Sequence, residues 1–333
     1  MKGGGMTMNV ELLVANESGS KVYQPAVEEG IEWTTQRAGT PGKLTFKVLK
    51  DDILDFTEGS AVRLKVDGDE VFYGFVFTKS RQKDQIITVI AYDQLRYLNN
   101  KDTKVYEGKT ATQFIQMLAA DYRLNVGDME DTGYVIASRV EENSSLFDMI
   151  QNALDLTLTN TGNMFVLFDS FGKLTLKSLG KMRVGDGDNY LMIDEETGEN
   201  FDYKSSIDSQ TYNKVKLTYD NEETGTREVY IAQSGENMNK WGILQYFDTL
   251  QKGENGQAKA DALLKLYNKK TRNLKIQNAF GDNRVRAGSL IVVNLALGDM
   301  SVKNFMLVEK CVHTYNESEH WMTLTLRGGE FVA

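Results

Sequence analysis

Cysteine and histidine, the residues best suited to nucleophilic or metal chemistry, are scarce in this chain and lie close together near its C-terminus. The sequence holds one cysteine, Cys311, and two histidines, His313 and His320. On a strand, Cys311 and His313 would point to the same face, and both residue types are zinc ligands. The spacing matches no familiar zinc pattern, and no nucleophile-elbow or oxyanion-hole sequence accompanies the pair. We therefore predict a buried thiol beside a polar loop, with no catalytic and no metal site.

Acidic runs are the second feature that could carry chemistry. A glycosidase needs two carboxyl groups across the scissile bond, and the runs Glu141-Glu142 and Asp194-Glu195-Glu196 supply carboxylates. The oxygens of Asp186-Gly187-Asp188-Asn189 would suit a calcium ion, but the acid at the twelfth position of an EF-hand loop is missing. Acidic runs within polar segments are typical of solvated loops and turns, and this is what we expect here.

Three further motifs bear on ligands and partners. The segment Gly253-Glu254-Asn255-Gly256-Gln257 lacks the strand and helix context of a phosphate-binding loop. The cluster Lys269-Lys270-Thr271-Arg272 is predicted to end a helix, where cations complement the helix dipole, rather than to form a nucleic-acid patch. Trp33, Trp241 and Trp321 could anchor partner contacts, since tryptophan is enriched in interface hot spots, although Trp321 suits the core equally well. We expect no cofactor, and the partner-binding residues stay open.

The composition limits the class of protein. With 333 residues, the chain is long enough for two or three domains. Its formal net charge of −9 argues against a wide surface for nucleic-acid phosphates. A single cysteine permits no intrachain disulfide and fits a reducing cytoplasm. No apolar run is long enough for a membrane-spanning helix, and the pattern of a secretory signal is missing.

The first third of the chain has the alternating pattern of β-strands. Apolar and polar residues alternate with a period of two over much of residues 10–97. Asp67-Gly68 predicts a hairpin, because glycine accepts a positive φ, and residues 94–98 read as a short closing helix. We predict a flexible N-terminus over 1–9 and a barrel-like β domain over 10–104.

The middle of the chain changes to helical spacing. Thr110 followed by Gln113, and Ser145 followed by Asp148, mark two helix starts with polar side chains three residues apart. Apolar residues recur at helical spacing after each start. We predict a small α+β domain over 105–200, made of two helices and a hairpin. Its strands are expected over residues 134–137, 164–168 and 173–177.

The last third returns to the strand pattern. Residues 214–219 and 226–231 are predicted to pair as a hairpin. A single helix follows, with Ala260 and Leu263 on its apolar face. We predict a second barrel-like β domain over 201–333 with one inserted helix.

The two β regions share a pattern. Each reads as a Gly-Ser turn followed by three strands, beginning at Gly59-Ser60 in the first region and at Gly288-Ser289 in the second. Two like units in one subunit let an oligomer present twice its own symmetry, which suits a symmetry adaptor better than a catalyst. Chance similarity between two small antiparallel sheets is the alternative. The predicted fold class is α+β, mainly β, with two barrel-like domains related by an internal repeat and a small α+β domain between them.

Three segments resemble a known family. Residues 110–122 resemble a helix of phage tail hub proteins, and residues 145–155 resemble the helix that follows it there. The stretch from Phe165 to Leu174 is similar to the hairpin that comes next. In this order, the segments resemble the XkdQ/YqbQ-like baseplate hub proteins of contractile phage tails, of the PBSX-type prophage and late-control kind. The resemblance covers residues 10–330.

This resemblance implies a structural protein rather than an enzyme, without a cofactor. The implied assembly is a homotrimeric ring that joins a sixfold tail tube to a threefold spike, and the free chain could be a monomer. The implied partners are the spike protein, the tail tube or tube-initiator protein and other baseplate proteins, with no specific nucleic-acid binding and no membrane span. The implied location is the bacterial cytoplasm during assembly and the phage tail baseplate afterwards.

Two alternatives stay open at this point. The first is a tail-associated enzyme that degrades peptidoglycan, which would need a cleft with a perturbed acid. The second is a β-rich carbohydrate-binding or adhesion module, which would need an exposed aromatic platform.

Overall fold

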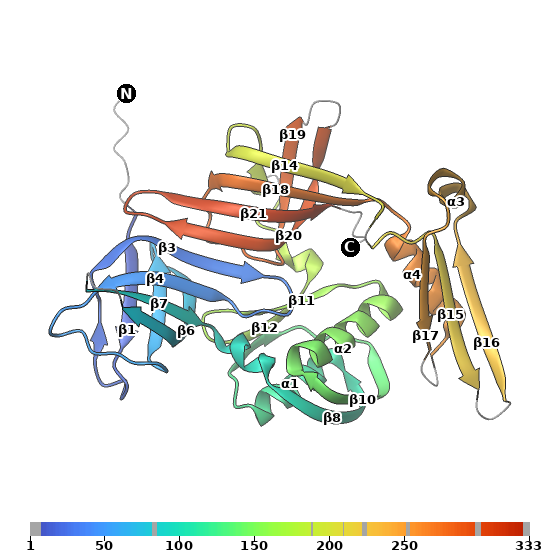
Figure 1. Cartoon of the computed structure of the whole chain (residues 1–333), viewed down its shortest axis with the longest axis horizontal. Helices are drawn as coiled ribbons and strands as arrows, with labels where there is room; N and C mark the ends of the chain where they lie inside the picture. Colours follow the sequence, from blue (N-terminus) through green and yellow to red (C-terminus); the bar gives the residue numbers. More distant parts are fainter. Residues whose placement is uncertain are drawn as a thin grey trace.

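A computed structural model describes residues 8–81, 85–187, 189–208, 210–221, 225–250, 254–296 and 301–328. Figure 1 shows the N-terminal β region in blue, the C-terminal β region in red beside it, and an α+β region in green below both. A small β unit projects at the far right. Most of the expected flexible N-terminus, Asp188 of the candidate calcium turn and Gly253 of the glycine-rich segment lie outside the described residues.

One sheet joins the first and last thirds of the chain. Its strands run in the order β14-β18-β21-β20-β3-β4-β7-β6-β5-β1-β2, with β19 beside β20 and β13 beside β19. Neighbouring strands pair antiparallel, except that β13 runs parallel to β19. The bounds are β1 Val10–Ala15, β2 Val22–Tyr23, β3 Val27–Gln36, β4 Lys43–Leu49, β5 Ala61–Val66, β6 Asp69–Arg81, β7 Ile86–Tyr92, β13 Met192–Ile193, β14 Gly198–Ser206, β18 Thr271–Phe280, β19 Leu290–Ala296, β20 Ser301–Tyr315 and β21 His320–Gly328.

The expected α+β, mainly β class is confirmed, but the two expected barrels are not closed among the described residues. The path of the sheet is open and ends at β14 on one side and at β2 on the other. The reason lies in the long strand β20, which pairs first with β19 and then with β3. The backbone groups along the outer edge of β3 are therefore satisfied by the C-terminal region and not by a strand that would close a barrel.

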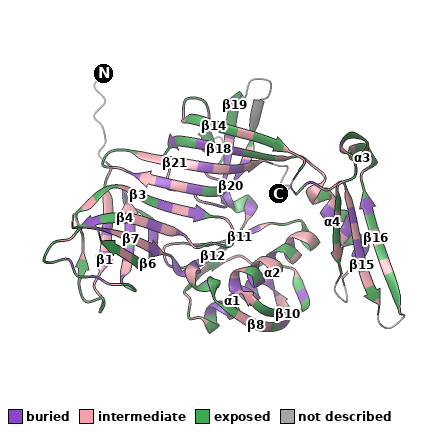
Figure 2. Cartoon of the chain, in the orientation of Figure 1, coloured by how far each residue is buried: buried purple, intermediate pink, exposed green. Residues whose placement is uncertain are grey.

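Alternating burial explains the strands of the N-terminal region. In β5 every second residue is buried, as Figure 2 also shows for its neighbours. The predicted hairpin at Asp67 and Gly68 is confirmed, since both residues have a positive φ, of 51° and 89°, as a two-residue turn between twisted strands requires. The buried side chains of this region form one cluster, to which β20 contributes Tyr315.

The α+β region follows the predicted helix starts. The Thr110 hydroxyl accepts a hydrogen bond from the Gln113 backbone N–H while the Gln113 side chain accepts one from the Thr110 N–H. The Ser145 hydroxyl accepts one from the Asp148 N–H. The elements are η1 Gln94–Asn99, β8 Lys101–Thr110, α1 Ala111–Asp121, β9 Val126–Met129, β10 Val135–Ser145, α2 Leu146–Thr161, β11 Phe165–Asp169, β12 Leu174–Ser178 and η2 Leu179–Met182.

A separate unit is inserted between β14 and β18. It packs the helix α4 on a three-stranded sheet of order β16-β15-β17, with its own hydrophobic cluster. The predicted hairpin of β15 and β16 is confirmed. The expectation of one inserted helix was wrong, because a short helix, α3, precedes the expected helix α4. The bounds are β15 Lys214–Asn221, β16 Thr226–Gln233, α3 Gly235–Trp241, β17 Gln245–Thr249 and α4 Gly256–Tyr267. Among the described helices, none combines the length and apolar character needed to cross a membrane.

The close approach of β6 to β7 provides a test of this packing. A Cβ atom at Gly74 would lie 2.2 Å from the backbone oxygen of Tyr92 and 2.6 Å from the Phe72 ring. We expect Gly74→Ala to lower the free energy of unfolding by about 1–3 kcal/mol, because overpacking forces backbone shifts. Gly180→Ala is the matched control, since nothing lies within 4 Å of its Cβ position. Urea denaturation of both variants measures the difference, and equal stabilities would contradict the packing described here.

Candidate assembly surfaces and the buried junction

The structure brings the cysteine and both histidines together, in the interior rather than at a surface. Cys311 and His313 are fully buried on β20, and the Cys311 Sγ lies 3.2 Å from His313 Nε2. His313 Nε2 lies 2.8 Å from the Val285 carbonyl oxygen, and His313 Nδ1 lies 2.8 Å from His320 Nε2. Because a carbonyl only accepts, Nε2 of His313 donates to Val285, and Nδ1 accepts from His320.

The electrostatics of this cluster do not suit nucleophilic catalysis. Burial lowers the pKa of His313 to about 3 and that of His320 to about 4, so both rings are neutral at pH 7. Burial also raises the pKa of the Cys311 thiol far above its usual value, so no thiolate forms. Within the described part of the chain, no group of three or more His, Cys, Asp or Glu side chains is arranged to hold a metal ion. The cluster fills the core as a hydrogen-bonded chain.

The acidic runs occupy structural positions. The Glu141 side chain is buried and accepts hydrogen bonds from Arg139 Nε and from Asn152 Nδ2. The Asp194 carboxylate accepts hydrogen bonds from the Thr197 hydroxyl and from backbone N–H groups in the turn before β14, and these bonds lower its pKa. Asp186 closes a turn, because its carbonyl accepts the Asn189 N–H. Asp186 and Asp194 stand in turns, as the sequence predicted, whereas Glu141 lies buried within β10 and not in a solvated loop.

The remaining motifs lie at the ends of helices and strands or in aromatic stacks. Asn255 caps α4, so the described part of the glycine-rich segment is a helix start. Thr271 of the basic cluster begins β18, just beyond the end of α4. Trp33 is buried and stacks on His313 with ring centroids 4.9 Å apart, while Trp321 stacks on Phe280 at 5.4 Å.

A hollow lies between α2, α4 and β21. Its volume is about 200 Å³, and its lining contains Asp155 as the one acid, beside Arg37 and Arg327. The pKa of Asp155 is raised by burial. A glycosidase needs a pair of carboxyl groups, and the lining of this hollow supplies one.

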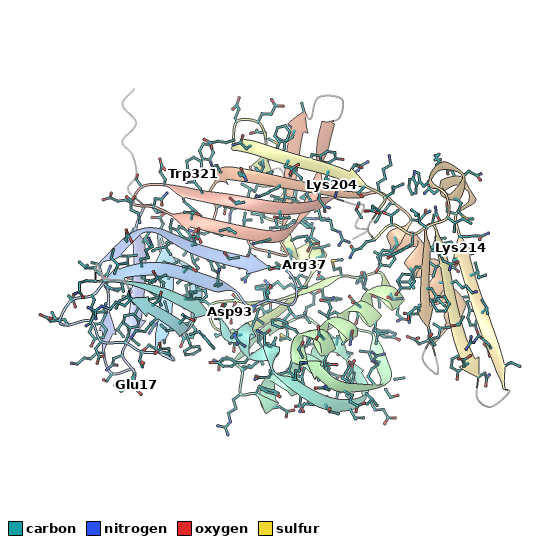
Figure 3. The ribbon with its side chains drawn as sticks, in the orientation of Figure 1. Glu17, Arg37, Asp93, Lys204, Lys214 and Trp321 are labelled. Atoms are coloured by element: carbon teal, nitrogen blue, oxygen red, sulfur yellow. The ribbon has the colours of Figure 1, made fainter. Side chains whose placement is uncertain are left out.

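The seam between the two β regions is defined as residues 310–315 of β20 with residues 31–36 of β3. Its register runs from Lys310 opposite Gln36 to Tyr315 opposite Ile31. Ile31 and Tyr315 are 5% and 1% exposed, so the seam belongs to the core. At its end, Arg37 Nε lies 2.7 Å from Glu309 Oε2 (Figure 3 labels Arg37). Backbone pairing, apolar contact and one ion pair thus join the two regions.

An arginine lies where three regions meet. Arg286, in the loop before β19, is half-buried as a residue, and its Cζ atom lies 4.2 Å from the centroid of the Phe168 ring on β11. Its Nη1 donates to the Asp169 carbonyl oxygen at 2.8 Å, and its Nε is buried without a partner among the described residues. We name Arg286, Asp93 and Asp169 the buried junction.

The two carboxyl groups of the junction are held by backbone and amide donors. Asp93, labelled in Figure 3 at the start of η1, accepts from the N–H groups of Gly42 and Leu95. The Asp169 carboxylate accepts from Gly172 N–H and from Gln94 Nε2. Burial raises the pKa of Asp93 well above its usual range and that of Asp169 to about 6, while the positive charge of Arg286 opposes both shifts.

Sequence reasoning missed this junction. Its three charged residues stand far apart along the chain, at positions 93, 169 and 286, and no local pattern connects them. The only local signal was the start of η1, where Asp93 is the N-cap.

Exposed apolar side chains mark further surfaces. On the outer face of the inserted sheet, Ile231 and Phe247 flank Lys216 and are 45% and 58% exposed. On β14, the outermost strand of the large sheet, Phe201 is 46% exposed. Exposed apolar groups gathered in this way are typical of interaction sites.

Comparison with known proteins identifies the family. A sequence model of the YqbQ-like family matches residues 31–327. The chain belongs to the YqbQ-like family. The resemblance drawn from three segments of the sequence is therefore confirmed.

Two relatives agree with this assignment. The chain is 29% identical over 329 residues to protein YqbQ of Bacillus subtilis, with 95% of each chain covered. It is 30% identical over 277 residues to the phage-like element PBSX protein XkdQ of the same organism, with 80% of this chain and 81% of the relative covered.

The fold is also found in solved structures of low sequence identity. The 43 kDa tail protein of prophage MuSo2 from Shewanella oneidensis has a TM-score of 0.66 at 13% identity, with 96% of each chain covered. The E. coli c3393 protein, a component of the type VI secretion system with structural similarity to T4 tail proteins gp27 and gp5, has a TM-score of 0.57 at 10% identity, with 96% of this chain and 78% of that chain covered.

The buried junction predicts a pH-dependent stability. A carboxyl group whose pKa is raised by folding stabilises the fold at low pH, and this contribution is lost as the pH rises through the folded pKa. Arg286→Met removes the positive charge that opposes the shifts at Asp93 and Asp169. We expect a loss of about 3–5 kcal/mol at pH 8 and a smaller loss at pH 5, measured by urea denaturation.

The control for this variant is Arg284→Met. The Arg284 side chain is 62% exposed and pairs with Asp282, so its removal should cost less than about 1 kcal/mol at either pH. An Arg286→Met loss that is the same at pH 5 and pH 8 would refute the electrostatic role of the junction.

Burial of Cys311 predicts an inert thiol. In the native protein at pH 8, iodoacetamide should label Cys311 only as fast as the chain unfolds, because the thiol is buried and protonated. In guanidinium chloride the same reagent should label one thiol per chain, as mass spectrometry would show. Rapid labelling of the folded protein would instead indicate a reactive cysteine and revive the enzyme alternative.

Proposed function

We propose that this chain is a structural protein of a contractile phage tail, the hub of its baseplate. Three copies form a ring that adapts the sixfold tail tube to the threefold spike. The chain acts by binding and not by catalysis. Its partners are the spike, the tube or tube-initiator protein and other baseplate proteins, and it assembles in the bacterial cytoplasm before it joins the tail.

The observation that carries this proposal is that the two β regions have corresponding strand orders. The N-terminal strands follow the path β3-β4-β7-β6-β5-β1, and the C-terminal strands follow the path β14-β18-β21-β20-β19-β13. The strands in these two paths also occur in the same order along the chain, apart from the unit inserted between β14 and β18. Two departures remain. The short strand β2, which pairs with β1, has no described counterpart beside β13. In addition, β1 pairs antiparallel with β5 while β13 pairs parallel with β19.

The Gly-Ser turns support the same correspondence. The Gly59 N–H donates to the Val76 carbonyl, and the Val76 N–H donates to the Ser60 carbonyl. Gly288, Val308 and Ser289 make the same two bonds in the C-terminal region. A bulge follows Val76 in β6 and Val308 in β20. The matching turns, bulges and strand orders support an internal repeat over chance similarity of two small sheets.

An internal repeat has a mechanical use in such a ring. A head-to-tail contact between copies closes into a ring when the rotation fits, and three chains with two like units each present six similar units. One face of the ring can then meet a sixfold tube while the chain itself remains threefold. Within this proposal the chain divides into 10–104, 105–200 and 201–333.

Of the alternatives, the peptidoglycan-degrading enzyme is less well supported, because Glu141 and Asp194 are bonded to structural partners and the lining of the hollow at Asp155 supplies no second carboxyl group. The carbohydrate-binding alternative needs an exposed aromatic platform. Trp33 is buried in the seam, while Phe280, which stacks on Trp321, is 56% exposed.

Light scattering tests the proposed ring. The free chain is expected to run as a monomer, and addition of the spike protein from the same tail should give a complex that contains three copies of this chain. Incubation of the purified chain with peptidoglycan is the parallel control and should release no soluble fragments. A stable complex with two copies, or release of fragments, would contradict the hub proposal.

A further inference from the structure

Each of the two strands that form the seam, β20 and β3, has a counterpart whose corresponding edge is unpaired among the described residues. These counterparts are residues 78–81 of β6 and the strand β14. On one side of β20, the first half of the strand pairs with β19 and residues 310–315 pair with β3. The strand β6 corresponds to β20 as far as Val76. Its first half pairs with β5, and the Gly59-Ser60 turn is hydrogen-bonded to Val76. Beyond Val76, residues 78–81 pair with β7 on the other side. On the β5 side, no described strand pairs with them.

The strand β14 stands where β3 stands in the N-terminal region. β3 pairs with β4 on one edge and with β20 on the other, whereas β14 pairs with β18 alone. Tyr203 of β14 lies opposite Leu274 of β18, and Trp33 of β3 lies opposite Leu44 of β4. Tyr203 is therefore the counterpart of Trp33. Two residues earlier, Phe201 takes the position of Ile31. Ile31 is 5% exposed under the seam, whereas Phe201 is 46% exposed at the free edge.

We propose that residues 78–81 of one copy pair antiparallel with β14 of a second copy, in the register of the internal seam. Carrying the seam register over gives Thr78 opposite Ser206, Ser80 opposite Lys204 and Arg81 opposite Tyr203. This inference rests on the proposed function and deepens it, since it names the strands that join one hub chain to the next.

The side chains at these two edges suit such a contact. The Tyr203 hydroxyl is buried and has no hydrogen-bond partner among the described residues, and the proposed register places the Arg81 guanidinium opposite it as a donor. In the seam, the corresponding pair is His313 stacked on Trp33. An arginine facing a tyrosine ring is a favourable pair of the same geometry.

The charges of the two edges are also complementary. Lys79 and Arg81 give the β6 edge two positive charges, while Glu199 and Asp202 give β14 two negative charges beside Lys204. Pairing would satisfy the outward backbone groups of residues 78–81 and of residues 203–206 of β14. Exposed edges of this length otherwise invite aggregation. Each copy carries one edge of each kind, so the contact is head-to-tail and can close into a ring.

A disulfide across the proposed contact tests the register. In the double variant Ser80→Cys with Lys204→Cys, the two positions of neighbouring copies lie directly opposite, at the Cα separation that a disulfide accepts. After oxidation of the complex with the spike protein, non-reducing electrophoresis should show cross-linked dimers and trimers of this chain. Cys311 is buried and should not contribute.

Three matched controls accompany this experiment. The single variants Ser80→Cys and Lys204→Cys should each give no cross-linked trimer. The double variant Ser80→Cys with Asp202→Cys shifts the register by two residues and should cross-link at least tenfold less, because diagonal positions lie about 7–8 Å apart.

The outcomes separate this inference from the hub proposal. If light scattering finds three copies but the shifted pair cross-links as well as the direct pair, or neither does, the proposed strand contact is wrong while the hub proposal stands. If no complex with three copies forms, both are overturned.

Discussion

The pairing of β20 with β3 is the constraint on which the rest of the fold depends. Through it, backbone groups of the last third of the chain satisfy those of the first third, and the two β regions become one sheet. The same contact places Tyr315 in the N-terminal core and His313 against Trp33. An edge strand such as β3 would otherwise expose unpaired donors and acceptors. The relative position of the two regions is therefore set by hydrogen-bond register and not by a flexible linker.

The buried junction fixes the third region against this sheet. Arg286 comes from the C-terminal region, Asp169 from β11, and Asp93 from the connection that leads out of β7. Buried charges of this kind contribute little net stability, because removing them from water is costly. Their geometry is demanding, however, since a displaced region would leave a carboxylate or a guanidinium without its counterpart. We infer that the junction mainly specifies how the three regions are arranged and adds little to the stability of the fold.

Features that depend on neighbouring residues could be predicted from the sequence, and features that depend on distant residues could not. The helix starts at Thr110 and Ser145 and the turn at Asp67-Gly68 require only residues within a few positions, and all three were predicted. The strand β10 was expected over 134–137 but extends to Ser145, because it pairs with β8, whose polar sequence carries no clear strand pattern. The seam and the buried junction join residues separated by most of the chain. No local pattern predicts that β20 pairs with β3. For this reason the sequence predicted two barrels where the structure has an open sheet.

The inserted unit leaves the sheet at one point and returns at the same point. Ser206 at the end of β14 lies opposite Thr271 at the start of β18, and the Thr271 hydroxyl donates to the Ser206 carbonyl. A plain turn could bridge these two positions, and lengthening such a connection costs entropy that grows only slowly with its length. The position is therefore a natural graft site. A foreign module with neighbouring termini could replace residues 210–267 and lie outside the sheet. The hydrogen bonds between β14 and β18 would stay in place.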